Sequence, residues 1–223
     1  MNDQEEVLRV PRGSDRMKSL YGKFSKIQGF IEKFERNLHE DGLKYLNPLP
    51  GEKILEIGFG RGRSLARIAR AVRPEGKAFG IDLTPEMVKK ARSHVKQQHL
   101  KEFVEIREGD ARELPWDRNF FDAVYMASTL ELFDNPDIPV VLDEIMRVLK
   151  DDGRLVIVSI TKKDRESSFG IRAYEWFHNT FPELASCRPI YPEKMVRTAG
   201  FEVLKSEVVG NIIPMDVLLA RPK

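Results

Sequence analysis

Short apolar runs alternate with helical patterns through the middle of the chain, and this alternation constrains the fold more than any other feature. Between the runs, apolar residues recur at the three- and four-residue steps of an amphipathic helix. Strands that alternate with helices imply right-handed crossovers and a parallel sheet with helices on both faces. The sequence therefore predicts an α/β protein with a doubly wound, mostly parallel sheet. The runs are KILEI, KAFGI, FVEI, FDAVYM and RLVIVSI, the last introduced by an Asp152-Gly153 turn.

The two ends of the chain depart from this alternation. Apolar residues step helically between Leu20 and Leu46, and the proline-containing stretch after Leu46 cannot continue a helix. We therefore expect a tail and an N-terminal helical cap over residues 1–46, and a main domain over residues 47–223.

The C-terminal part of the main domain adds three further elements. Aromatic residues between Phe169 and Phe181 predict a helical insertion at about residues 162–191. A last helix is expected from Pro192 to Thr198, followed by FEVLKSEVVG and MDVLLA as closing strands. Because these two strands are close in sequence, we expect an antiparallel C-terminal strand.

Composition narrows the classes of protein and of partner. The net charge is +2, and basic residues are interspersed with acidic ones, which indicates a solvated surface and no nucleic-acid partner. A single cysteine, Cys187, provides neither a disulfide nor a thiolate zinc cluster, and we expect no metal. No apolar run approaches the roughly 18 residues of a membrane span. We expect a cytoplasmic protein without an integral membrane segment, and the oligomeric state stays open.

A glycine-rich segment, EIGFGRGRS, lies between the first predicted strand and the first predicted helix. Gly58, Gly60 and Gly62 permit a tight turn and let a ligand approach the backbone, and the following helix offers free N–H groups. A dinucleotide site favours G-x-G-x-x-G, but Arg63 stands where the third glycine belongs. The loop suits a polar, nucleotide-like ligand, with a simple chain turn as the alternative.

This segment, with Glu56 two residues before Gly58, resembles the first motif of class I S-adenosylmethionine-dependent methyltransferases. Asp82 follows roughly 20 residues later, as an acidic residue that accepts ribose hydroxyls does. Asp110 and Ala127 follow the third and fourth predicted strands. The resemblance covers about half of the chain. It implies a Rossmann-like fold, S-adenosyl-L-methionine as cofactor and methyl transfer as the activity.

The resemblance also implies a role for each matching residue. The loop backbone at Gly58, Gly60 and Gly62 would contact the methionine part of the cofactor, with Glu56 toward its ammonium group. Asp110 would accept from the adenine amino group, the Ala111 N–H would meet a ring nitrogen, and Leu83, Met87 and Ala127 complete the cofactor-binding set. Two alternatives stay open: Asp82 as part of the start of the helix after Thr84, and Asp110 as an ordinary turn.

The flanking segments are similar to the ubiquinone and menaquinone C-methyltransferase group. By that likeness Tyr21 would help to close the cap over the cofactor, and the acceptor would be a small, apolar or aromatic molecule, with lipid-like and quinone-like compounds as candidates. Glu131 and His178 are the catalytic candidates. An NAD-dependent oxidoreductase, or a protein that binds the cofactor without catalysis, stays as an alternative.

Overall fold

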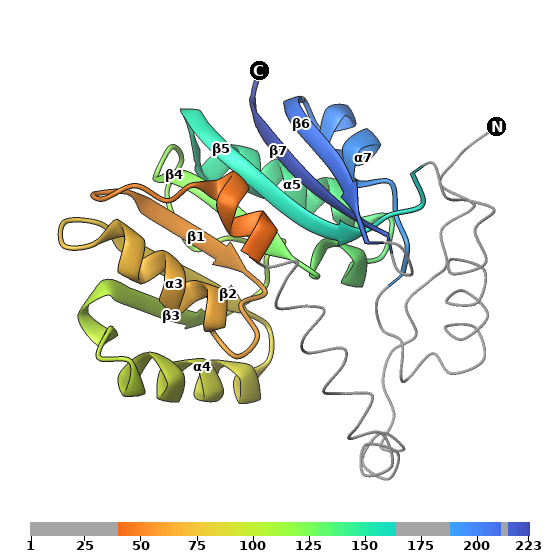
Figure 1. Cartoon of the computed structure of the whole chain (residues 1–223). Helices are drawn as coiled ribbons and strands as arrows, with labels where there is room; N and C mark the ends of the chain where they lie inside the picture. The colour runs from red at the N-terminus through yellow and green to blue at the C-terminus, as the bar shows by residue number, and fades with distance from the viewer. Residues whose placement is uncertain (1–39, 164–187, 211–213) are drawn as a thin grey trace, which may run out of the picture.

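The computed structural model describes residues 40–163, 188–210 and 214–223 (Figure 1). Its centre is a seven-stranded sheet in the order β3-β2-β1-β4-β5-β7-β6. All neighbours are parallel except β7, which is antiparallel to both β5 and β6. The doubly wound sheet and its antiparallel C-terminal strand are therefore confirmed. The strands are β1 Lys53–Ile57, β2 Lys77–Asp82, β3 Val104–Glu108, β4 Phe121–Ala127, β5 Leu149–Ile160, β6 Phe201–Val209 and β7 Met215–Pro222.

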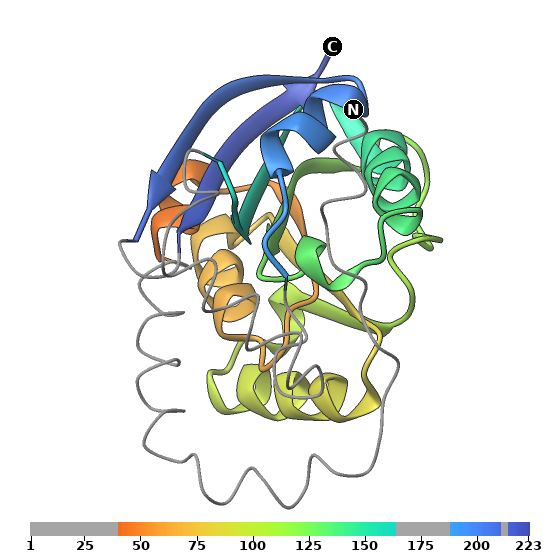
Figure 2. The ribbon, with the colours of Figure 1, turned by 90° about the vertical axis from the view of Figure 1, so that its right-hand side faces the viewer.

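Helices cover both faces of the sheet, as the alternating pattern predicts. One core lies between the sheet and α3, α4 and the helical residues 40–46, and a second core lies between the sheet and α5 and α7. Figures 1 and 2 show α3 and α5 on opposite sides of the strands. The α-helices are α3 Arg63–Val72, α4 Pro85–Gln97, α5 Asp137–Val148 and α7 Pro192–Thr198, with short 3-10 turns η2 Lys101–Phe103 and η3 Leu130–Leu132.

The beginning of β5 differs from the sequence prediction. A turn at Asp152-Gly153 was expected ahead of the strand, but both residues lie within β5, which begins at Leu149. The pairing with β4 jumps from Phe121 opposite Leu149 to Ala123 opposite Arg154. The expectation of a turn is wrong because the irregular pairing takes up the extra residues without ending the strand.

The junction between residues 40–46 and the sheet is held by Arg154. Its guanidinium donates from Nε to the Leu46 carbonyl over 2.6 Å and from Nη2 to the Asn47 carbonyl over 3.1 Å. The same group forms an ion pair with Glu52 at 2.7 Å. The helix ends at Leu46 as expected, and Leu43 and Leu46 are buried against the sheet. The earlier part of that predicted helix lies outside the described residues.

Within residues 40–163, 188–210 and 214–223, no helix combines the length and the apolar character that a membrane span requires.

Candidate active site

The loop between β1 and α3 has a backbone that only glycine adopts easily. Gly58, Gly60 and Gly62 have φ angles of 71°, 51° and 75°, in the left-handed region where a Cβ is unfavourable. A Cβ on Gly58 would overlap the side chain of Thr129, and one on Gly62 would lie 2.9 Å from the Cβ of Ala91. Two of the three glycines are therefore needed for close packing within the chain.

Gly60 differs from the other two glycines. Within the described part of the chain, a Cβ placed on Gly60 would meet no atom within 4 Å. The middle of the loop therefore turns one side to open space. This is where a ligand can approach the backbone directly.

Asp82, the last residue of β2, fixes the middle of this loop. Its Oδ2 accepts the Gly60 N–H over 3.0 Å, and its Oδ1 accepts the Thr84 N–H over 2.9 Å. Each carboxylate oxygen has a second lone pair, and the side chain is only half-buried, so it can still accept from a ligand. Thr84 caps α4 without a side-chain hydrogen bond. Both the ligand role and the helix-start alternative therefore remain compatible with this geometry.

Glu56 lies under the loop as a buried acid. It is 2% exposed, and within the described residues its Oε2 has no hydrogen-bond partner. Burial, and then the charge of Asp82, raise the pKa of Glu56 well above its ordinary value. A buried carboxyl with an unused oxygen is costly unless a partner reaches it. An ammonium group bound at the loop would supply such a partner.

Asp110 follows β3 at the same edge of the sheet, but its carboxylate is engaged by Arg112. Arg112 donates from Nε to Oδ2 over 3.0 Å and from Nη2 to the same oxygen over 2.6 Å. This hydrogen bonding lowers the pKa of Asp110, which is ionised at neutral pH. The other end of the guanidinium donates to Asp137 over 3.1 Å. Sequence reasoning missed Arg112, because nothing in the pattern indicates which charge an exposed arginine will pair with.

The remaining cofactor candidates take different positions around the loop. Leu83 is 67% exposed, an unusual state for a leucine beside a glycine loop, and Met87 is half-buried. Ala111 and Ala127 are buried. An exposed apolar side chain next to Asp82 is suited to cover the flat face of a bound base.

The exit of β4 brings Thr129 against the glycine loop. Ser128 has a φ of 51°, which turns the chain sharply at the end of the strand. Thr129 then donates from Oγ1 to the Ala127 carbonyl over 2.9 Å, and its side chain fills the space that a Cβ on Gly58 would need. Thr129 was not among the sequence candidates. The glycine at position 58 could have suggested a close neighbour, but not which one.

Glu131 is completely buried in η3, where it joins the exit of β4 to the end of β5. Its Oε2 accepts the Ser159 hydroxyl over 2.9 Å, and its Oε1 accepts the Ile160 N–H over 3.4 Å. Burial raises the pKa of Glu131 to about 7, and these hydrogen bonds limit the rise. Glu131 can therefore hold a proton near neutral pH, and it also fixes η3 against the sheet.

A buried arginine that the sequence did not indicate lies near Glu131. Arg188 is 1% exposed and attracts the Glu131 carboxylate electrostatically. Its Nη1 donates to Asn135 Oδ1 over 2.7 Å, and its Nη2 donates to the Phe133 carbonyl. The other two candidates, Tyr21 and His178, lie outside the described residues. The described site therefore comprises the glycine loop, Glu56, Asp82, Asp110 and the Glu131 cluster at one edge of the sheet.

A glycine loop, acidic residues at successive strand ends and the strand order together define a nucleotide-binding α/β protein of the Rossmann-like type. Residues 54–153 match the family described as a methyltransferase domain. The chain is 31% identical over 175 residues to a demethylmenaquinone methyltransferase of Symbiobacterium thermophilum, covering 68% of this chain and 69% of that protein. A demethylmenaquinone methyltransferase of Lactococcus lactis is 26% identical over 214 residues, covering 86% of this chain and 83% of that protein.

Solved structures agree with these sequence matches. A structure of a SAM-dependent methyltransferase from Aquifex aeolicus superposes with a TM-score of 0.63 at 25% identity, covering 82% of this chain and 89% of that one. The chain belongs to the class I S-adenosylmethionine-dependent methyltransferases. Its cofactor is S-adenosyl-L-methionine, and it is an enzyme. The unused Glu56 oxygen and the open side of Gly60 fit that cofactor.

Proposed function

We propose that this methyltransferase acts on a small, apolar or aromatic acceptor, with a quinone-like compound as the leading candidate. The observation that carries the proposal is the likeness to demethylmenaquinone methyltransferases, which extends over most of the chain and well beyond the glycine loop. The acceptor class is the part of the proposal that the experiment below tests.

In this proposal, residues at the strand ends bind the cofactor. Glu56 receives its ammonium group, and the backbone at Gly58, Gly60 and Gly62 contacts its methionine part. Asp82 accepts from the ribose hydroxyls while still holding Gly60, since each oxygen has a lone pair left for a ligand. Leu83 and Met87 flank the base, Asp110 and Ala111 bind its edge, and Ala127 lies beside the reacting end.

The bound cofactor supplies an electrophilic methyl group on a sulfonium. The protein must hold the acceptor in line with that group and exclude water, which is where most of its contribution to rate arises. Glu131 lies in η3, shortly after β4, and its pKa of about 7 is one that a residue accepting a proton from an acceptor would have. We propose Glu131 and His178 as catalytic candidates and Tyr21 as a residue that closes the cap.

The wider assignments made from the sequence belong to the same proposal. They comprise a cap over residues 1–46, a catalytic domain over residues 47–223 with an insertion at about 162–191, and a cytoplasmic enzyme with no nucleic-acid partner. Support for the last point comes from the described surface, where several basic residues form ion pairs with acidic ones.

The acceptor assignment is tested by measuring S-adenosylhomocysteine with a panel of acceptors. Demethylmenaquinone would be supplied with and without a chemical reductant, because a reduced, electron-rich ring is the better nucleophile toward a methyl cation equivalent. Phenols and polar amines complete the panel, and the Asp82→Ala protein is the negative control. Product formed with the quinone or phenols supports the proposal. Cofactor binding followed by transfer only to polar, non-aromatic acceptors would contradict it.

A further inference from the structure

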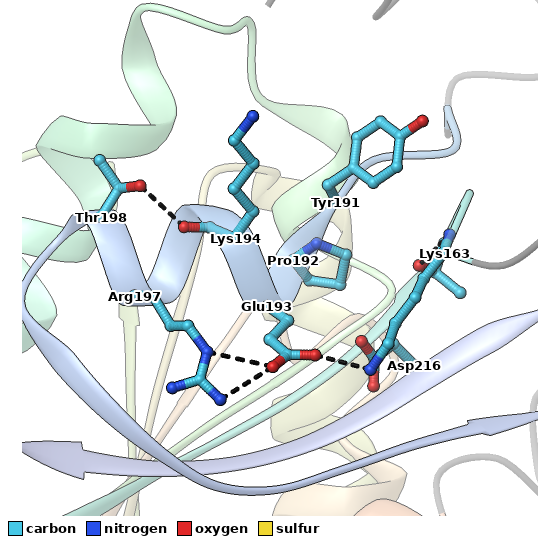
Figure 3. Close-up of a pocket in the computed structure, with 9 residues that line it drawn as sticks. Lys163, Tyr191, Pro192, Glu193, Lys194, Arg197, Thr198 and Asp216 are labelled. Carbon is cyan, nitrogen blue, oxygen red and sulfur yellow. Dashed lines mark hydrogen bonds and ion pairs between the residues drawn. The ribbon is translucent and has the colours of Figure 1, made fainter. Parts of the chain in front are cut away.

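A cavity outside the cofactor loop opens between α7, the end of β5 and the start of β7 (Figure 3). Its volume is about 440 Å³, within the roughly 300–1,000 Å³ of small-molecule sites. None of the residues that line this cavity belongs to the cofactor site described above. It is lined by Thr161, Lys163, Tyr191, Pro192, Glu193, Lys194, Arg197, Thr198 and Asp216.

Asp216 provides the cavity with an unused hydrogen-bond acceptor. The residue is 0% exposed and lies in register with Ser159 across the β5–β7 pair. Its Oδ1 accepts the Ser206 hydroxyl over 2.8 Å, but within the described residues its Oδ2 has no partner. Burial raises the pKa of Asp216. A buried oxygen without a partner costs stability, so its presence in a cavity wall calls for an external donor.

Two of the basic side chains that line the cavity, Lys163 and Arg197, form ion pairs with the same carboxylate, that of Glu193. The Lys163 ammonium contacts Glu193 over 2.6 Å and the Ser206 hydroxyl over 3.0 Å. Arg197 donates to the other oxygen of Glu193 over 2.8 Å, as Figure 3 shows. Three basic side chains thus face two carboxylates around the cavity. A cationic ligand would be repelled by this excess of positive charge, whereas an uncharged donor would not.

The rest of the lining suits an apolar body. Pro192 and the ring of Tyr191 lie beside the cavity, and the methylene chains of Lys163 and Lys194 add apolar surface below their charged ends. A ligand that combines a ring with one hydroxyl group matches both parts of this lining.

We propose that this cavity is a second small-molecule site, which binds an uncharged, hydroxyl-bearing ring compound through a hydrogen bond donated to Asp216 Oδ2. The site is separate from the glycine loop, and the proposal does not depend on the identity of the methyl acceptor. It makes Asp216 a specificity residue for hydroxyl donors.

The test compares phenol with anisole, which has the same ring but lacks the hydroxyl donor. Both would be titrated into the full chain by protein-observed NMR, and the variants are Asp216→Leu and, as a matched exposed control, Asp151→Leu. We expect phenol to bind at least about tenfold more tightly than anisole. Asp216→Leu should remove that preference, and Asp151→Leu should keep it.

Equal binding of phenol and anisole to the unmutated protein would overturn the proposal. So would an Asp216→Leu protein that keeps the full preference for phenol. If the leucine variant does not fold, Asp216→Ala, which also lacks a side-chain acceptor, is used with the same criterion. S-adenosylmethionine affinity is measured in parallel and should not change in either Asp216 variant, which keeps this result separate from the methyltransferase function.

Discussion

Replacing Glu131 with glutamine should make the stability of the protein less dependent on pH. Glutamine keeps the shape of the side chain but cannot ionise. Its amide oxygen can accept the Ile160 N–H, and its amide nitrogen can donate to the Ser159 oxygen in place of the bond that Ser159 donates now. The substitution therefore removes the titration of a fully buried group while preserving both contacts.

The size of the effect follows from the shift in the pKa of Glu131. Its pKa is about 7 in the folded protein against an ordinary 4.5, so the folded state holds the proton more tightly than the unfolded state. The stabilisation is fully present below about pH 4.5 and is lost as pH rises through 7. Between pH 5 and pH 8 the loss amounts to about 2 to 3 kcal/mol of unfolding free energy.

Urea unfolding of the two proteins at several pH values measures this difference directly. The unfolding free energy of the Glu131→Gln protein minus that of the unmutated protein should rise by about 2 to 3 kcal/mol from pH 5 to pH 8. Other buried acids such as Glu56 titrate in both proteins and cancel in the difference.

Glu144→Gln serves as the control for this experiment. Hydrogen bonding to Arg147 lowers the pKa of Glu144, so its stabilisation is lost only as pH falls below 4.5. The Glu144 difference should therefore be flat over the same range. Parallel stability curves for the Glu131→Gln and unmutated proteins would refute the reasoning, since they would mean that Glu131 is ionised in the folded protein across the whole range.

Three further substitutions test the cofactor site. Asp82→Ala should weaken S-adenosylmethionine binding by about 10- to 150-fold in calorimetry, because about 1.5 to 3 kcal/mol of charge-assisted hydrogen bonding is lost; unchanged affinity would remove Asp82 from the site. Gly60→Val should abolish binding, whereas Gly51→Val, which has a φ of 89° and equally open space, carries the same backbone strain and should leave binding intact. Equal effects of the two valines would mean that strain alone is responsible. Glu56→Gln should raise the melting temperature of the ligand-free protein, because a buried carboxyl of raised pKa is removed. The same substitution should lower the affinity for the cofactor at least about tenfold. A decrease in both the melting temperature and the affinity would mean that Glu56 has a purely structural role.

The sequence predicted the sheet well because its signals were local and repeated. Each apolar run that was predicted as a strand forms one, and the helix start at Thr84-Pro85 and the end of α7 before Gly200 lie where the residue types indicate. The Asp152-Gly153 pair misled because a turn signal is also compatible with irregular pairing inside a long strand. Only the partner strand decides between the two, and the sequence does not show that partner.

The site was predictable as a position but not as a set of contacts. Strand ends located Asp82, Asp110 and Glu131 at one edge of the sheet. Arg112 donates to Asp110 and also to Asp137, and the Ser159 hydroxyl donates to the buried Glu131. The contacts with Asp137 and Ser159 join side chains from distant segments. No periodicity or motif in the sequence indicates these side-chain contacts. The position of each residue at a strand end could therefore be predicted, but its hydrogen bonds and its pKa could not.

The hydrogen bond of Arg154 to the Leu46 carbonyl and its ion pair with Glu52 limit how segments can be exchanged between related enzymes. A chimera that joins a foreign cap at residue 47 would keep Arg154 in the sheet but depend on the new segment for its acceptor and for side chains equivalent to Leu43 and Leu46. Without that acceptor, and with a cavity where Leu43 and Leu46 pack now, the chimera would lose several kilocalories per mole of stability. This is roughly the sum of one lost charged hydrogen bond and one truncation of a core side chain. Successful recombination therefore requires the crossover to fall before residue 40, so that helix end, glutamate and arginine are inherited as one unit.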